Sequence, residues 1–85
     1  MISIRQFRYF VEVVDAGSYS RAAEKLYIAQ SALSRQIKEL ESEVQALLLT
    51  RDARHIELTP AGQVFYERAR RILDDIDETV RQTRH

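Results

Sequence analysis

Apolar residues recur at helical spacing along most of this chain, and this periodicity restricts it to a mainly helical fold. The first stretch covers residues 4–16, where one face carries Ile4, Phe7, Phe10, Val11 and Val14. Ser3 and Gln6 have the pattern of a capping box, which satisfies unpaired backbone donors at a helix start. Gly17 tolerates a left-handed C-cap, so we expect this helix to end there.

Two further helices follow at short intervals. Ser18 is a suitable N-cap for a short helix that runs to about Leu26. The pattern restarts after residues 27–29, and a third helix is predicted from Gln30 to Val44, with an apolar stripe made of Leu33, Ile37, Leu40 and Val44. Two helices joined by so short a turn are typical of a helix-turn-helix.

The helical pattern stops between residues 47 and 58. Leu47–Leu49 is a short apolar run, residues 51–54 are turn-like, and residues 55–58 alternate polar and apolar side chains. This pattern predicts a small β-hairpin, which must pack against the helices because a two-stranded hairpin is marginal alone.

A long last helix is predicted from residue 59. Thr59 and Pro60 form a strong helix start, and neither proline nor interior glycine interrupts the chain from there to about Arg84, apart from Gly62 in the first turn. About 25 residues would span roughly 37 Å, which is more than a small core needs. Its apolar side chains therefore predict a seam for a second copy, formed by Phe65, Ala69, Ile72, Leu73, Ile76 and Val80.

Composition excludes several classes of protein. There are no cysteines, which rules out a disulfide scaffold and a thiolate zinc site. We find no signal peptide and no apolar run near the ~18 residues of a membrane span, so we expect a cytoplasmic protein that contacts no membrane. The 13 Lys and Arg balance the 13 Asp and Glu, so any case for nucleic acid depends on where the charges lie.

The third helix has a polar face opposite its apolar stripe, and this contrast is the main functional evidence. The face carries Gln30, Ser31, Ser34, Arg35, Lys38 and Ser42, with no acidic group until Glu39. Arginine can pair with guanine and glutamine with adenine, and a recognition helix contacts bases through its N-terminal residues. The alternative is an ordinary solvated face.

Other cations form weaker candidates. Arg51, Arg54 and His55 lie within five residues at the predicted hairpin, where arginine could enter a minor groove. Arg21 and Lys25 on the second helix could reach phosphates and position the domain without reading sequence. Each set could equally be an ordinary charged surface.

Several stretches together resemble the LysR-type transcriptional regulators. They are residues 8–11 (RYFV), 16–26 (AGSYSRAAEKL), 29–41 (AQSALSRQIKELE), 48–51 (LLTR), Arg54 and 58–62 (LTPAG). The likeness covers residues 4 to about 73 in order and spacing, which makes it far more specific than a single short motif.

The resemblance implies a winged helix-turn-helix over residues 1–58, with three helices and a small β-hairpin wing, followed by a dimerisation helix over residues 59–85. It implies that Gln30, Ser31, Ser34, Arg35 and Lys38 face a major groove and that Arg54 is the wing arginine. A homodimer should then recognise an inverted repeat in double-stranded DNA. The family's C-terminal domain, which senses a small-molecule inducer, has no room here, so we expect this chain to be part of a longer regulator.

Three positions depart from the family pattern. Ser31 stands where proline is usual, so the third helix could be capped differently. Gln45 replaces a usual glycine, and we expect the third helix to run on or end less sharply without that C-cap. Leu49 replaces a usual phenylalanine, which affects the packing of the wing.

Two rival functions, an enzyme and a helical protein-interaction module, explain the sequence less well than DNA binding. Only His55 and His85 could act as imidazole bases, and neither belongs to a nucleophile, metal or cofactor pattern, so we expect no catalysis and no cofactor. A helical protein-interaction module would explain the last helix but not the basic face of the third. Salt dependence separates the two, because binding to phosphates weakens steeply as salt rises.

Overall fold

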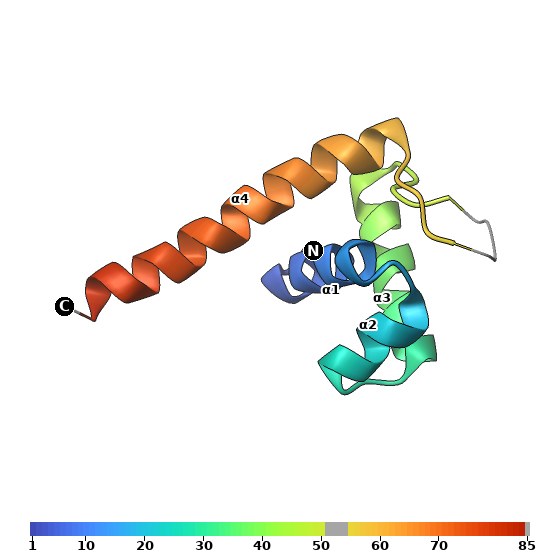
Figure 1. The fold of residues 1–85 in the computed structure, drawn as a ribbon. Coiled ribbons are helices and arrows are strands. Elements are labelled where there is room, and N and C mark those ends of the chain that lie inside the picture. The colour runs from blue at the N-terminus through green and yellow to red at the C-terminus, as the bar shows by residue number, and fades with distance from the viewer. Residues whose placement is uncertain (51–54, 85) are drawn as a thin grey trace.

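The computed structural model describes residues 1–50 and 55–84, and helices dominate it (Figure 1). Its helices are α1 (Ile4–Ala16), α2 (Tyr19–Leu26), α3 (Gln30–Val44) and α4 (Pro60–Thr83). The helices expected from the sequence are thus present, and their bounds lie close to the predicted ones. Three of them make a compact body, and α4 extends past it as a long rod, so the molecule measures 46 × 26 × 22 Å.

Local capping explains most helix ends. Ser3 and Gln6 form both bonds of the capping box before α1, and Gly17 ends that helix at a φ of 76°. The side chain of Ser18 accepts a hydrogen bond from the Arg21 amide at the start of α2, and that of Thr59 accepts one from the Gly62 amide at the start of α4. These side chains satisfy backbone donors that the first helical turn leaves unpaired.

The end of α3 differs from the expectation. Gln45 adopts the left-handed conformation that glycine usually occupies, with a φ of 57°, and α3 stops at Val44. Its amide donates to the carbonyls of Glu41 and Ser42, and the Ala46 amide donates to the Glu41 carbonyl at 3.2 Å. These bonds satisfy the last carbonyls of α3 and offset the steric cost of the conformation. The prediction of a less sharp end was therefore wrong.

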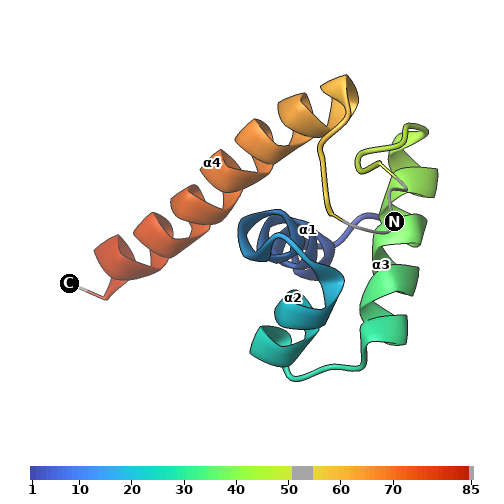
Figure 2. The same ribbon diagram turned by 45° about the vertical axis from the view of Figure 1, so that its right-hand side comes forward.

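One apolar core joins the first three helices and the segment after α3. Its fully buried side chains include Phe10, Val13, Leu33, Ile37, Leu40, Leu48 and Leu49. Ala22 and Ala23 of α2 are also buried, and their small size allows α1 and α3 to approach closely. In Figure 2, α2 and α3 are joined by a short turn, which is the helix-turn-helix arrangement.

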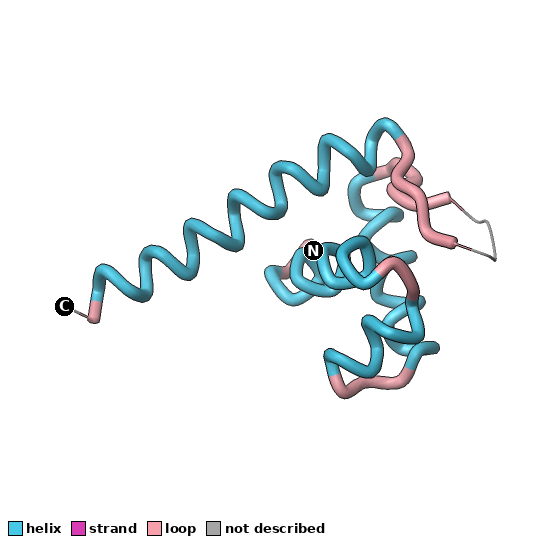
Figure 3. The backbone as a smooth tube through the Cα atoms, in the orientation of Figure 1, coloured by secondary structure: helices cyan, strands magenta, loops and turns pink. Residues whose placement is uncertain are grey.

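Residues 46–59 connect α3 to α4 (pink and grey in Figure 3). Leu49 and Leu58 form one antiparallel bridge, while the Thr50 amide donates to the Glu57 carbonyl at 2.9 Å and the Thr59 amide to the Leu48 carbonyl at 3.0 Å. Among the described residues this pairing does not extend into a strand. The predicted β-hairpin wing is therefore not confirmed, although the two sides of its base are paired.

A second apolar cluster packs α4 against α1. Val11, Ala69 and Leu73 are buried there, with Phe7 and Phe65 partly buried beside them. The Phe65 ring meets those of Phe7 and Phe10 edge-on, each at a centroid distance of 5.3 Å, which is a favourable aromatic geometry. The first half of α4 thus belongs to the same body as the helix-turn-helix.

Candidate nucleic-acid interface

The polar face of α3 points outward, because the opposite stripe holds the helix in the core. Leu33, Ile37 and Leu40 are completely buried. Of the polar side chains on the other face, Ser34 is half-buried and the exposed ones are Gln30, Ser31, Arg35, Lys38 and Ser42. The residues expected to contact DNA on α3 therefore share one accessible surface, which we call the α3 polar face.

The start of α3 is electropositive. Its N-cap is Ala29, whose side chain makes no capping bond, and the first turn carries no acidic residue. The first backbone amides of a helix lack partners within the helix, and the helix dipole adds a partial positive charge there. Together these features favour a phosphate or another anion next to residues 30–32.

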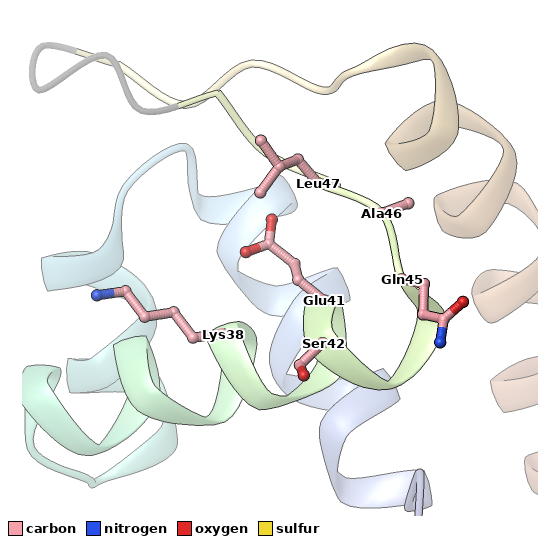
Figure 4. A pocket seen from close by; sticks show the side chains of 6 residues that line it. All are labelled: Lys38, Glu41, Ser42, Gln45, Ala46 and Leu47. Atoms are coloured by element: carbon pink, nitrogen blue, oxygen red, sulfur yellow. The ribbon is translucent and has the colours of Figure 1, made fainter.

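Two cations lie on the same face. Arg35 and Lys38 are exposed, and neither forms an ion pair with another described residue. Figure 4 shows the Lys38 side chain extending toward the N-terminal end of α3, away from the Glu41 carboxylate. Both charges are therefore available to a polyanion.

Gln30 has a neighbour that sequence spacing did not indicate. The Ser20 hydroxyl of α2 donates to the Gln30 side-chain oxygen at 3.1 Å. A carbonyl oxygen has two lone pairs, so Gln30 can still accept one hydrogen bond while its NH2 group donates another. Ser20 thus orients the glutamine amide without blocking pairing to a base edge.

The two cations of α2, Arg21 and Lys25, have different surroundings in the structure. Arg21 is exposed, and its backbone amide is held by the Ser18 cap. Lys25 instead pairs with Glu12 of α1 at 3.4 Å, although its side chain stays 66% exposed. Arg21 is therefore the better candidate for a phosphate contact on this helix.

Arg51 and Arg54, the cations expected at the wing, lie outside the described residues. The neighbouring His55 side chain contacts Glu57. The base of the predicted wing, where Leu49 pairs with Leu58, lies next to the C-terminal end of α3. Glu41 of α3 accepts hydrogen bonds from the Leu48 and Leu49 amides and so connects the helix to this base.

Glu41 is the residue that the sequence analysis missed. It is only 5% exposed, and one of its carboxylate oxygens accepts hydrogen bonds from the Leu48 and Leu49 amides at 2.8 and 3.2 Å. Figure 4 shows this side chain rising from α3 toward the segment that carries Ala46 and Leu47. It ties the end of α3 to the start of the wing segment, beside a surface hollow lined also by Lys38, Ser42 and Gln45.

The residues expected to form the dimer seam divide into two groups. Ala69 and Leu73 are buried against α1, and Phe65 packs there too. Ile72 and Val80 remain 39% and 43% exposed, Ile76 is half-buried, and with Asp75 and Thr79 they line a shallow groove. Val64, which the sequence analysis did not include, is 63% exposed at eight residues before Ile72. The outward seam of α4 is thus narrower than expected.

Other kinds of site find no support in residues 1–50 and 55–84. No group of His, Asp or Glu side chains there could hold a metal ion. In the same residues no helix has both the length and the apolar character needed to cross a bilayer.

Comparison with known proteins gives consistent relatives. The family "Bacterial regulatory helix-turn-helix protein, lysR family" matches residues 4–63. The HTH-type transcriptional regulator BenM of Acinetobacter baylyi is 45% identical over 83 residues, which are 98% of this chain and 27% of BenM. The nitrogen assimilation regulatory protein nac of Klebsiella aerogenes is 44% identical over 91% of this chain and 25% of its own length. The chain thus spans about a quarter of these curated relatives.

Solved structures agree in fold. The BenM DNA-binding domain in complex with catB site 1 DNA superposes with a TM-score of 0.94 at 44% identity, covering 98% of this chain and 93% of that one. The CbnR DNA-binding domain in a DNA complex gives a TM-score of 0.91 at 40% identity, with 98% and 95% covered. Full-length BenM matches with a TM-score of 0.94, but this chain covers only 28% of it.

Proposed function

This chain belongs to the lysR family of bacterial regulatory helix-turn-helix proteins, and from that premise we propose that it binds double-stranded DNA sequence-specifically, as part of a dimeric transcription regulator. The observation that carries the proposal is the exposed α3 polar face. Its Arg35 and Lys38 form no ion pair with another described residue, and they lie on a helix whose N-cap makes no side-chain hydrogen bond.

In the proposed complex, α3 lies in a major groove. Arg35 pairs with a guanine edge, and Gln30, oriented by Ser20, contacts an adenine. Ser31 and Ser34 approach the DNA backbone or the base edges closely because their side chains are short. Lys38 neutralises a phosphate, and Arg21 does the same from α2.

The wing segment, residues 47–58, is proposed to lie at the adjacent minor groove, where Arg51 and Arg54 would meet focused negative potential. The tie between Glu41 and the Leu48 and Leu49 amides supports this arrangement, because it holds the base of the segment at a fixed place relative to α3.

We assign dimerisation to the outward seam of α4, formed by Ile72, Ile76 and Val80. Residues 60–71 contain three arginines and one glutamate, whereas residues 72–83 contain four acidic residues and one arginine. An antiparallel pair of α4 helices would place opposite charges together. A two-fold dimer of this kind requires an inverted repeat in its operator.

For the longer protein we propose a cytoplasmic regulator, as the named relatives are transcriptional regulators. A C-terminal domain absent from this chain would bind the inducer. We assign this chain neither catalysis nor a cofactor.

The test is binding to a duplex that the protein itself selects from a random-sequence pool. Replacing Arg35 by Ala should cost about 1–3 kcal/mol on the selected duplex and relax preference at one base position. The control is Arg81→Ala, which removes a cation from the far end of α4 and should change neither quantity. An equal loss on selected and random duplexes would make Arg35 a phosphate contact. An affinity for the duplex that does not change with salt concentration would instead favour a protein-interaction module.

A further inference from the structure

We propose that Asp15 is a positioning residue that fixes the direction in which α4 leaves the helix-turn-helix body. In the dimer this direction sets the separation of the two half-sites, a consequence that rests on the proposed function. The contacts behind the proposal all lie within one chain, so they can be tested without DNA.

The apolar contact between α1 and α4 acts as a pivot. Val11 packs with Ala69 and Leu73 where the two helices cross, and the Phe65 ring lies nearby against α1. Apolar attraction has no preferred direction, so by itself this contact holds the helices together but only weakly defines their crossing angle.

Polar contacts on both sides of the pivot restrict that angle. Asp15, four residues beyond Val11, uses both carboxylate oxygens: the Tyr66 hydroxyl donates to one at 2.5 Å and Arg70 to the other at 3.1 Å. On the other side, Arg8 pairs with Asp77 at 3.7 Å. Charge-assisted hydrogen bonds depend on direction, so the Asp15 cluster resists rotation about the pivot.

The length of α4 amplifies any change at this point. About 14 residues separate Ala69 from Thr83, which corresponds to roughly 21 Å of helix. A swing of about 10° would move the far end of α4 by about 4 Å, close to the rise of one base pair. Figures 1 and 2 both show this part of α4 extending beyond the body. A small angular freedom would therefore blur the spacing between half-sites.

The cluster is too exposed to be mainly a source of stability. The side chains of Asp15 and Arg70 are 39% and 47% exposed, and exposed ion pairs add little to the free energy of folding. Geometry is the property that such a contact can still control.

The first test measures the angle directly. Because the chain has no cysteine, Glu39→Cys and Thr83→Cys place two spin labels on α3 and the end of α4. Mixing with excess unlabelled protein restricts pulsed-EPR distances to those within one chain. We expect Asp15→Ala to broaden or shift the distance distribution and Asp15→Asn to do so less, since its side-chain oxygen still accepts from Tyr66.

Two further variants make the result decisive. Arg81→Ala removes an exposed ion pair within α4, its 2.6 Å contact with Glu78, and should leave the distribution unchanged. Tyr66→Phe removes only a hydroxyl, and it should broaden the distribution even if Asp15→Ala failed to fold. Identical distributions in the unchanged protein, Asp15→Ala and Tyr66→Phe would overturn the proposal.

The second test measures spacing on DNA. The unchanged protein selects a duplex from a random pool, and its spacer is then lengthened or shortened by one or two base pairs. We expect Asp15→Ala to lose about threefold or more of the preference for the selected spacer, while binding to one half-site stays the same. An unaltered preference would refute the spacing role. If the unchanged protein selected no duplex, the proposed function would fail, and the EPR distances would still decide on Asp15.

Discussion

Within residues 1–50 and 55–84, two side-chain-bearing residues adopt a backbone conformation that usually belongs to glycine. Tyr27 ends α2 at a φ of 58° and Gln45 ends α3 at a φ of 57°. At Tyr27 the amide donates to the Ala23 and Glu24 carbonyls, and the left-handed turn lets α3 begin three residues later. The tight geometry between α2 and α3 is thus maintained by backbone hydrogen bonds despite local strain.

This strain leads to a stability prediction. Gln45→Gly should raise the free energy of unfolding by about 1 kcal/mol, because glycine removes the clash at positive φ. The matched control is Gly17→Ala, at a φ of 76° with no atom within 4 Å of the added Cβ. It should lower stability by a similar amount through conformation alone. Urea unfolding of both variants checks the pair, and a destabilised Gln45→Gly would contradict the account.

The Tyr66 hydroxyl predicts a response to alkaline pH. Its hydrogen bond to Asp15 raises the pKa of Tyr66 above the ordinary 10.0, and partial burial and the Asp15 charge add to the increase. A pKa that is higher in the folded state stabilises the protein below the unfolded value, and this contribution is lost as pH rises through the folded value.

We therefore expect stability to fall more steeply above about pH 10 in the unchanged protein than in Tyr66→Phe. Ultraviolet titration should show that Tyr66→Phe removes a tyrosine that ionises above the ordinary pKa of 10.0. Equal alkaline losses in both proteins would exclude this coupling.

At the scale of single residues, the sequence predicted what depends on near neighbours. The caps at Ser3, Gly17, Ser18 and Thr59 follow local rules and are confirmed. The role of Glu41 could not be predicted, because its partners are backbone amides seven and eight residues away that no side-chain pattern marks.

Among the elements, the contact between the start of α4 and the wing segment is unusually close. A Cβ on Gly62 would lie 2.0 Å from the Leu48 carbonyl oxygen, which itself accepts from the Thr59 amide at 3.0 Å. Backbone meets backbone here, so no side-chain rotation could make room. This close contact explains why a glycine, Gly62, stands in the first turn of α4.

Gly62→Ala should accordingly destabilise the chain by about 1–3 kcal/mol, the usual cost of overpacking. Gln63→Ala, one residue later on the exposed side of α4, should stay within about 0.5 kcal/mol of the unchanged protein. Thermal unfolding compares them. A neutral Gly62→Ala would mean that α4 and the Leu48 carbonyl separate more easily than the structure indicates.

Helix positions could be predicted at this scale, whereas helix partners could not. Phe65, Ala69 and Leu73 have the periodicity of a dimer seam, yet they pack on α1 of their own chain. A periodic apolar stripe shows that a face is covered but does not identify the covering element. The narrower outward seam of α4, with Ile72 and Val80, is what remains for a second copy.

For the whole molecule, the remaining seam makes dimerisation testable. Ile72→Asp should place a charge within the apolar contact and yield monomers in sedimentation experiments. The control is Ile4→Asp, which puts the same charge on a side chain that is 50% exposed on α1. A dimer that survives Ile72→Asp unchanged would refute the assignment of the seam.

The balance of charge across the molecule explains why composition alone did not indicate the proposed function. The formal net charge is zero, yet the charges are unevenly placed. Several acidic residues lie along α4, whereas Arg35 and Lys38 on the α3 polar face form no ion pair with another described residue. The proposed DNA binding would depend on this local separation of charge rather than on the sum.

Amide chemical shifts recorded while the selected duplex is added test that claim most directly. The account predicts the largest changes at residues 30–38, smaller ones at Arg21 and the wing segment, and almost none at the far end of α4. Changes confined to α4, with residues 30–38 unaltered at saturation, would contradict it.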